Sequence, residues 1–82
     1  MKYEEIKNDL ENIIKMVKTD ISDFDDDLSF SDLGINSLMY IRILVMIEEK
    51  YNIQLDEEVV KKGVTSFDTI HNFALYLSEK YS

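Results

Sequence analysis

Apolar residues recur at intervals of three and four along most of this chain, and few residues that break helices interrupt them. Proline is absent, and the two glycines are Gly34 and Gly63. A spacing of three and four places apolar side chains on one face of an α-helix, which must then pack against another element. The sequence therefore predicts an all-α fold in which amphipathic helices share one core.

Four segments fit helices, and two of them begin with recognisable capping chemistry. Asn36 and Ser37 precede the second apolar segment, and Thr65 and Asp68 have the spacing of a capping box before the last one. The third segment is short and ends at Gly63. We expect a small four-helix bundle. The expected helices span about residues 3–17, 37–51, 56–61 and 66–80.

A long acidic loop is expected between the first and second helices. Residues 18–36 lose the helical period and carry six aspartates. A connection of this length within a small domain is uncommon and usually functional. Apolar residues within it should anchor it to the core. These are Ile21, Phe24, Leu28, Phe30 and Leu33.

Length and charge disfavour several classes of function. The 82 residues suffice for one domain, expected to cover residues 1–82, and leave little room for a deep catalytic cleft. Seventeen acidic and nine basic residues give a formal charge of −8, which disfavours nucleic acid and anionic membranes as partners. The sequence contains no cysteine and no apolar run of membrane-spanning length, and we expect no signal peptide because residues 1–16 mix acidic and apolar residues. We expect a monomeric cytoplasmic protein without a metal site.

The second helix is more apolar than a surface helix of so small a domain should be. Every residue in 38–46 except Arg42 is apolar. A helical projection gives this segment two faces. The first is a core face of Tyr40, Ile43, Leu44, Ile47 and Tyr51. The opposite side, called the outer face below, consists of Leu38, Ile41 and Val45 with Met39, Arg42, Glu48 and Glu49 on its flanks. Such a surface is typical of protein association, unless the first and last helices cover both faces.

Ser37 stands where the loop meets the outer face. A serine in this position is most often a helix cap. Serine catalysis needs a base beside the nucleophile, and the only histidine, His71, lies midway along the last helix, where we expect it to face solvent. The free N–H groups and the positive dipole end of a helix start would favour a phosphate attached to Ser37.

Several motifs in a fixed order resemble one family. FSDLGINSL at residues 30–38 is followed by an apolar helix that ends in EEKYNI, and then by LDEEV. This arrangement covers nearly the whole chain and is similar to the carrier proteins, which comprise acyl carrier proteins and the related peptidyl and aryl carrier domains. The resemblance implies a four-helix bundle with a 4'-phosphopantetheine arm joined to Ser37 by a phosphodiester.

The resemblance also implies a non-catalytic role and a set of partners. The arm would hold acyl, aminoacyl or peptidyl groups as thioesters. A phosphopantetheinyl transferase would attach the arm from coenzyme A with Mg²⁺. An adenylating or acyl-loading enzyme and downstream synthase or modifying enzymes would then act on the cargo. By the same resemblance, partners contact the start and outer face of the second helix, at Leu38, Met39, Ile41, Arg42 and Val45.

Departures from the family's fatty-acid members favour a specialised pathway. Asn36 replaces the aspartate that usually precedes the serine, and Met39 and Arg42 stand where those members carry acids. Glu48 and Glu49 alone keep the acidic pattern. Since charge governs the choice of partner, we expect thiotemplated peptide or polyketide synthesis. A housekeeping fatty-acid acyl carrier protein is the alternative.

Calcium binding and partner binding without modification are two alternative functions for these residues. Asp23, Asp25 and Asp27 alternate like the start of an EF-hand loop, but Leu28 and Gly34 stand where that loop needs glycine and glutamate. A helical adaptor that binds partners without any modification would explain the outer face equally well. It would not explain a serine at the edge of that face.

Overall fold

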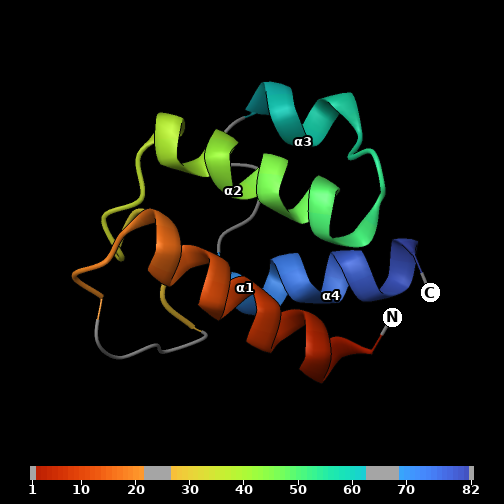
Figure 1. Ribbon diagram of the computed structural model, residues 1–82, viewed down its shortest axis with the longest axis horizontal. Helices are drawn as coiled ribbons and strands as arrows, with labels where there is room; N and C mark the ends of the chain where they lie inside the picture. The colour runs from red at the N-terminus through yellow and green to blue at the C-terminus, as the bar shows by residue number, and fades with distance from the viewer. Residues whose placement is uncertain (1, 22–26, 63–68, 82) are drawn as a thin grey trace.

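The computed structural model describes residues 2–21, 27–62 and 69–81. Within these ranges the chain forms the α-helices α1 (Tyr3–Val17), α2 (Ser37–Tyr51), α3 (Glu57–Lys62) and α4 (Ile70–Lys80), and no named strand (Figure 1). One isolated antiparallel bridge joins Ser29 to Thr69. The predicted all-α fold, with a long connection between its first two helices, is confirmed.

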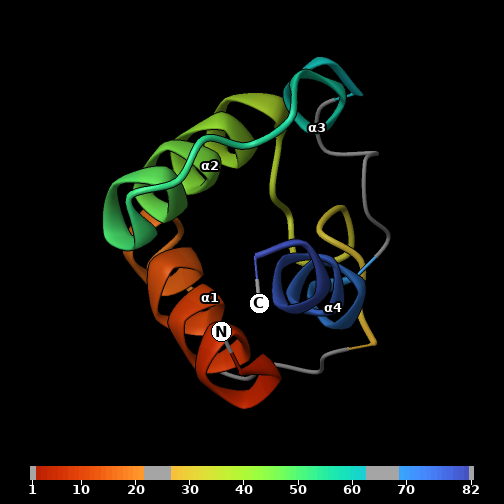
Figure 2. The ribbon, with the colours of Figure 1, turned by 90° about the vertical axis from the view of Figure 1, so that its right-hand side faces the viewer.

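The helices surround one apolar interior. Figure 2 looks nearly along α4 and shows α1 and α2 on one side of it, while α3 lies next to the upper right end of α2 in this view. The long helix α1 packs against both α2 and α4. Among the described residues every buried side chain is apolar or aromatic. The expected core face of α2 is largely confirmed, because Tyr40, Ile43, Leu44 and Ile47 are buried and Tyr51 is half-buried.

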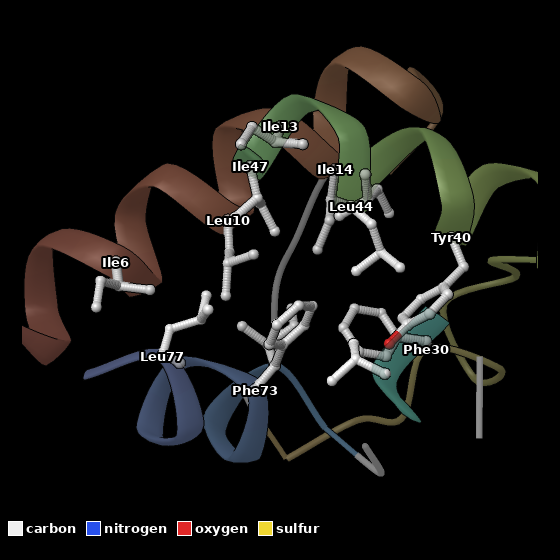
Figure 3. Packing of buried hydrophobic residues seen from close by; sticks show 14 of the residues in the cluster. Ile6, Leu10, Ile13, Ile14, Phe30, Tyr40, Leu44, Ile47, Phe73 and Leu77 are labelled. Atoms are coloured by element: carbon white, nitrogen blue, oxygen red, sulfur yellow. The ribbon is translucent and has the colours of Figure 1, made fainter. Parts of the chain in front are cut away.

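Three aromatic rings join the loop to two helices. Phe30 from the loop, Tyr40 from α2 and Phe73 from α4 are fully buried and meet in the interior (Figure 3). Their ring centroids are 5.8 Å apart for Phe30 and Tyr40, and 6.1 Å apart for Phe30 and Phe73. Aromatic contacts of this kind stabilise beyond the area that they bury. Phe30 therefore anchors the loop directly beneath the start of α2.

The start of α4 differs from the expected position. Thr69 is extended, with φ −140° and ψ 165°, and its Oγ1 accepts a hydrogen bond from the Asn72 N–H at 3.1 Å. The helix thus begins at Ile70 and not near Ser66, because Thr69 is its N-cap. The proposed capping box of Thr65 and Asp68 lies outside the described residues. The short third helix begins at residue 57, one position after the expected start.

Tyrosine hydroxyls tie the helices together at their polar rims. Tyr51 at the end of α2 donates to Asp9 of α1. The Tyr76 hydroxyl of α4 donates to Asp56 Oδ2 at 2.7 Å, and Asp56 lies in the connection between α2 and α3. Burial and the neighbouring Asp56 raise the pKa of the Tyr76 hydroxyl well above its usual range. The hydrogen bond from Tyr76, with a further contribution from Lys80, lowers the pKa of the Asp56 carboxyl. The Tyr51 bond therefore joins α2 to α1, and the bonds of Asp56 fix α4 against the connection that follows α2.

Candidate functional site

The start of α2 is closed by Asn36. Its Oδ1 accepts a hydrogen bond from the Met39 N–H at 2.9 Å, and its carbonyl oxygen accepts from the Tyr40 N–H at 2.9 Å. Asn36 has φ −88° and ψ 177°, the extended backbone of an N-cap. The cap is therefore Asn36 alone, and Ser37 is the first residue of the helix rather than a second capping residue.

Ser37 is exposed, and its hydroxyl forms no hydrogen bond with any residue that the structure describes. The Ser37 and Leu38 N–H groups lie in the first turn, where no intrahelical acceptor reaches them. That turn contains no acidic residue. An anion bound to the Ser37 oxygen would therefore meet free N–H donors and the positive end of the helix dipole, without a carboxylate in that turn.

A compact turn carries the chain into this site. The Asp32 N–H donates to Ser29 Oγ at 2.9 Å, and the Ile35 N–H donates to the Phe30 carbonyl at 2.9 Å. Phe30 and Ile35 are buried, so the turn is attached to the core on both sides of Gly34. The apolar period did not identify Ile35, because it stands alone between a glycine and the cap.

The remaining loop anchors are only partly as expected. Ile21, Leu28 and Leu33 are half-buried, and Ile21 and Leu33 pack against the core. Phe24 lies outside the described residues. The strongest anchors of the described loop are thus Phe30 and Ile35, which are both buried.

Gly34 has a backbone that other residues rarely adopt. Its φ is +82°, and a Cβ at this position would lie 2.8 Å from the Cε of Lys18. The Lys18 side chain crosses the turn and donates from Nζ to Asp20 Oδ1 at 2.6 Å. This hydrogen bond lowers the pKa of the Asp20 carboxyl. The end of α1 is thereby connected to the turn that precedes Ser37, a contact that no sequence pattern indicates.

The outer face of α2 is largely open to solvent. Leu38 is 70% exposed, and Ile41 and Val45 are each 45% exposed. The alternative in which α1 and α4 cover both faces of α2 is therefore wrong. The start of α2 lies at the end of the molecule opposite to the first turn of α1 and the last turn of α4 (Figure 1). Ser37 thus stands at one pole of the molecule, beside an exposed apolar surface.

The flanking residues of the outer face divide into two groups. Arg42 and Glu49 are exposed. Met39 is half-buried and packs against the core. Glu48 is half-buried, and its Oε2 accepts a hydrogen bond from the Leu55 N–H at 2.9 Å. The Glu48 carboxylate therefore has a structural partner within the chain, whereas Arg42 and Glu49 project from it.

A shallow groove extends the apolar surface towards α1. It has a volume of about 340 Å³ and is lined by Ile13 and Met16 of α1 together with Met46, Glu49 and Lys50 of α2. Met16 is 60% exposed. Met46 stands nine residues after Ser37, or about 14 Å along the helix. The groove is thus separated from Ser37 by most of the outer face.

The structure also bears on serine catalysis and on metal binding, the two alternatives considered above. His71 is exposed, as expected, and its Nδ1 lies 2.6 Å from the Tyr3 hydroxyl, so its described partner is on α1 and not at Ser37. Within the described ranges no three His, Cys, Asp or Glu residues are grouped so that they could hold a metal ion. Asp23 and Asp25 lie outside those ranges. No described helix has the length and apolar character needed to cross a membrane.

Comparison with known proteins identifies the family to which the chain belongs. A helical bundle with an exposed serine at the start of its second helix is the arrangement of a carrier protein. The family model described as a phosphopantetheine attachment site matches residues 5–77, and the chain belongs to this family. Neither the curated proteins nor the solved structures gave a match. The chain is therefore a carrier protein with an attachment site for covalent 4'-phosphopantetheine, and carrier proteins in general interact with a phosphopantetheinyl transferase and with partner enzymes.

Proposed function

We propose that the arm is attached at Ser37 and that the chain delivers acyl, aminoacyl or peptidyl groups to partner enzymes. The observation that carries this proposal is the exposed Ser37 hydroxyl, without a described hydrogen-bond partner, at the start of a helix in a phosphopantetheine attachment family. The other described serines lack this setting. Ser29 accepts from the Asp32 N–H within the turn, Ser78 donates to the Leu75 carbonyl inside α4, and Ser31 is exposed but lies in the turn and not at the start of a helix.

The attachment step balances with the substrates of a transferase. Ser37 Oγ forms a bond to the phosphorus that bears the pantetheine arm of coenzyme A. The pyrophosphate bond of coenzyme A breaks, 3',5'-adenosine bisphosphate leaves, and the serine proton passes to a base of the transferase. The resulting phosphodiester carries one negative charge, which the first-turn N–H groups of Ser37 and Leu38 stabilise. Asn36 keeps those groups oriented by closing the helix.

The attached group supplies a terminal thiol that holds cargo as a thioester. The chain positions this group, and none of its described residues places an acid or base in hydrogen-bond contact with Ser37, so we propose a non-catalytic role. A tether converts each encounter with a partner's active site into a local one and raises the effective concentration of the cargo. Delivery is then the function of the chain, and the reactions on the cargo belong to its partners.

We further propose a specialised thiotemplated pathway of the peptide or polyketide type, located in the cytoplasm. The support is the charge at the start of α2, where Met39 and Arg42 are present and the first turn has no acid. An enzyme that recognises acids on a fatty-acid carrier would not find them here. A housekeeping fatty-acid carrier remains the second candidate, favoured by the exposed Glu49.

Arm transfer in vitro tests this proposal. The purified chain is incubated with coenzyme A, Mg²⁺ and a broad-specificity phosphopantetheinyl transferase, and its intact mass is measured. The wild type should gain the mass of one arm, and Ser37→Ala should gain none. Ser31→Ala removes another exposed hydroxyl from the preceding turn and should gain the arm like the wild type. No mass gain in the wild type, or a gain that persists in Ser37→Ala, would contradict the proposal.

A further inference from the structure

We infer that the enzyme which docks on the outer face of α2 presents a carboxylate to Arg42 within an otherwise apolar contact. This inference rests on the proposed function, because it concerns the enzymes that meet the arm at Ser37. It specifies the chemistry of the partner's surface, which an attachment site alone does not define. It also explains how a carrier with a strongly negative net charge can bind an enzyme surface that carries a negative group.

Arg42 is distinguished from the other basic residues by its surroundings. It is the only arginine among the nine basic residues of the chain. It is exposed and forms no ion pair or hydrogen bond with any residue that the structure describes. Several lysines, in contrast, lie within 4.0 Å of a carboxylate oxygen. They are Lys7, Lys18, Lys50, Lys61 and Lys80.

The neighbours of Arg42 on the helix are apolar. Leu38 precedes it by one turn, and Val45 and Met46 follow it by one turn. Glu49 is seven residues further on, or about 10 Å along the axis. Arg42 therefore stands in the middle of an apolar row formed by Leu38, Val45 and Met46. The chain has seventeen acidic residues, and none of those that the structure describes pairs with Arg42.

Docking of a partner on this row would remove water from the guanidinium. An arginine cannot lose its charge, so a contact that buries it without an acceptor is strongly unfavourable. A carboxylate satisfies it best, since two oxygens match the planar fork of N–H donors. The formal charge of −8 opposes the nucleic acids and anionic lipids that could offer phosphate instead. The acceptor is thus assigned to an Asp or Glu of a protein.

The test measures docking without the arm. Ser37→Ala protein is titrated against purified adenylating enzymes that load carrier proteins, and the tightest binder is used as the probe. Arg42→Glu should weaken the dissociation constant at least about tenfold, because close charge pairs across interfaces couple strongly. Arg42→Gln should weaken it less than Arg42→Glu, and Arg42→Lys should retain part of the affinity because the charge remains without the fork.

A matched control separates local pairing from net charge. Lys2→Glu changes the net charge by the same amount as Arg42→Glu, and Lys2 is the exposed N-cap residue of α1. The first turn of α1 lies at the opposite end of the molecule from the start of α2 (Figure 1). Lys2→Glu should leave the dissociation constant within about twofold of wild type. Circular dichroism should show equal helicity in all variants, because substitutions at exposed positions rarely disturb the fold.

Charge reversal on the enzyme then identifies the acceptor. Each Asp and Glu on the probe's carrier-binding surface is changed to Lys in turn, and one of these changes should restore the binding of Arg42→Glu. The inference is overturned if Arg42→Glu binds like wild type, if Lys2→Glu weakens binding equally, if no reversal restores it, or if no enzyme of the panel binds. Failure of arm transfer to Ser37 is measured separately by intact mass, so it contradicts the proposed function and leaves the docking result to decide this inference.

Discussion

Two adjacent side chains at the start of α2 have separate tasks. Asn36 closes the helix through its hydrogen bond from the Met39 N–H, and Ser37 is thereby left exposed for modification. A serine that served as the cap would have its oxygen engaged with the helix backbone. Replacement of the cap therefore tests whether the stability of this turn depends on Asn36 and not on Ser37.

Asn36→Ala should lower the free energy of unfolding by about 1 kcal/mol, because the Met39 N–H loses its acceptor. Asn36→Asp should retain most of the stability, since aspartate caps equally well. Urea denaturation followed by circular dichroism measures both variants. Ser37→Ala serves as the comparison and should change the free energy of unfolding by less than about 0.5 kcal/mol. An equal loss in Asn36→Ala and Ser37→Ala would show that the assignment of the cap is wrong.

Gly34→Ala should be destabilising by about 1–2 kcal/mol, because φ at this position is +82° and an added Cβ would crowd Lys18. The lysine chain is flexible, so most of the cost should come from the backbone. The double variant with Lys18→Ala, measured by the same denaturation, should therefore recover little of the loss. Full recovery would mean that crowding and not the backbone conformation is the cause.

At the scale of elements, the end of α2 is stabilised by an acid that the sequence groups with the outer face. Glu48 accepts a hydrogen bond from the Leu55 N–H, and its carbonyl oxygen accepts from the Ile53 N–H at 3.1 Å. The neighbouring Glu49 is exposed and lines the groove towards α1. The two glutamates thus differ in task although they are adjacent in the chain.

Glu48→Ala should lower the free energy of unfolding by about 1.5–3 kcal/mol, because the carboxylate is a charged acceptor for a part-buried N–H. Glu49→Ala is the matched control and should change it by less than about 0.5 kcal/mol. Denaturation of the two variants side by side gives the comparison. Similar free energies for both would contradict the structural role of Glu48.

The apolar spacing predicted the helical class and most of the core face of α2, because both follow from a local period. It could not place the start of α4, because the chain has a threonine both at 65 and at 69 and the hydrogen bond from the Asn72 N–H to Thr69 is visible only in the structure. Phe73 fits the helical period with Ile70 and Leu77, but its burial against Phe30 of the loop depends on packing between distant segments.

The candidate site was predictable in part. The family resemblance singled out Ser37, and the period separated the core and outer faces of α2. The contacts of Lys18 with Gly34, of Glu48 with Leu55 and of His71 with Tyr3 join residues whose proximity no local pattern expresses. Such contacts depend on how the elements pack, so only the structure reveals them.

At the scale of the whole molecule, polar bonds between distant segments hold the bundle around its interior. Asp56 is one centre of these bonds, since it accepts from the Tyr76 hydroxyl and lies 3.0 Å from the Lys80 Nζ. Its pKa is lowered, first by the Tyr76 hydrogen bond and then by that from Lys80. A carboxyl with a lowered pKa in the folded state contributes stability above its unfolded pKa and loses it as the pH falls.

Asp56→Asn should therefore be less stable than wild type at pH 7, and the difference should shrink as the pH falls below about 4, the unfolded pKa of aspartate. Urea denaturation of both proteins at pH 7 and pH 3 measures the difference. A gap that stays constant, or grows, between the two pH values would show that the ionised Asp56 carboxyl does not stabilise the fold.

We propose that one exposed hydroxyl at the pole of the bundle, that of Ser37, carries the arm in the living cell. The most direct measurement is fragment-ion mass spectrometry of a digest of the protein isolated from its own cells, read at each serine. We predict that the mass of phosphopantetheine is localised to Ser37. An arm localised to another residue, or a chain that carries no arm under conditions in which its pathway is active, would contradict the account.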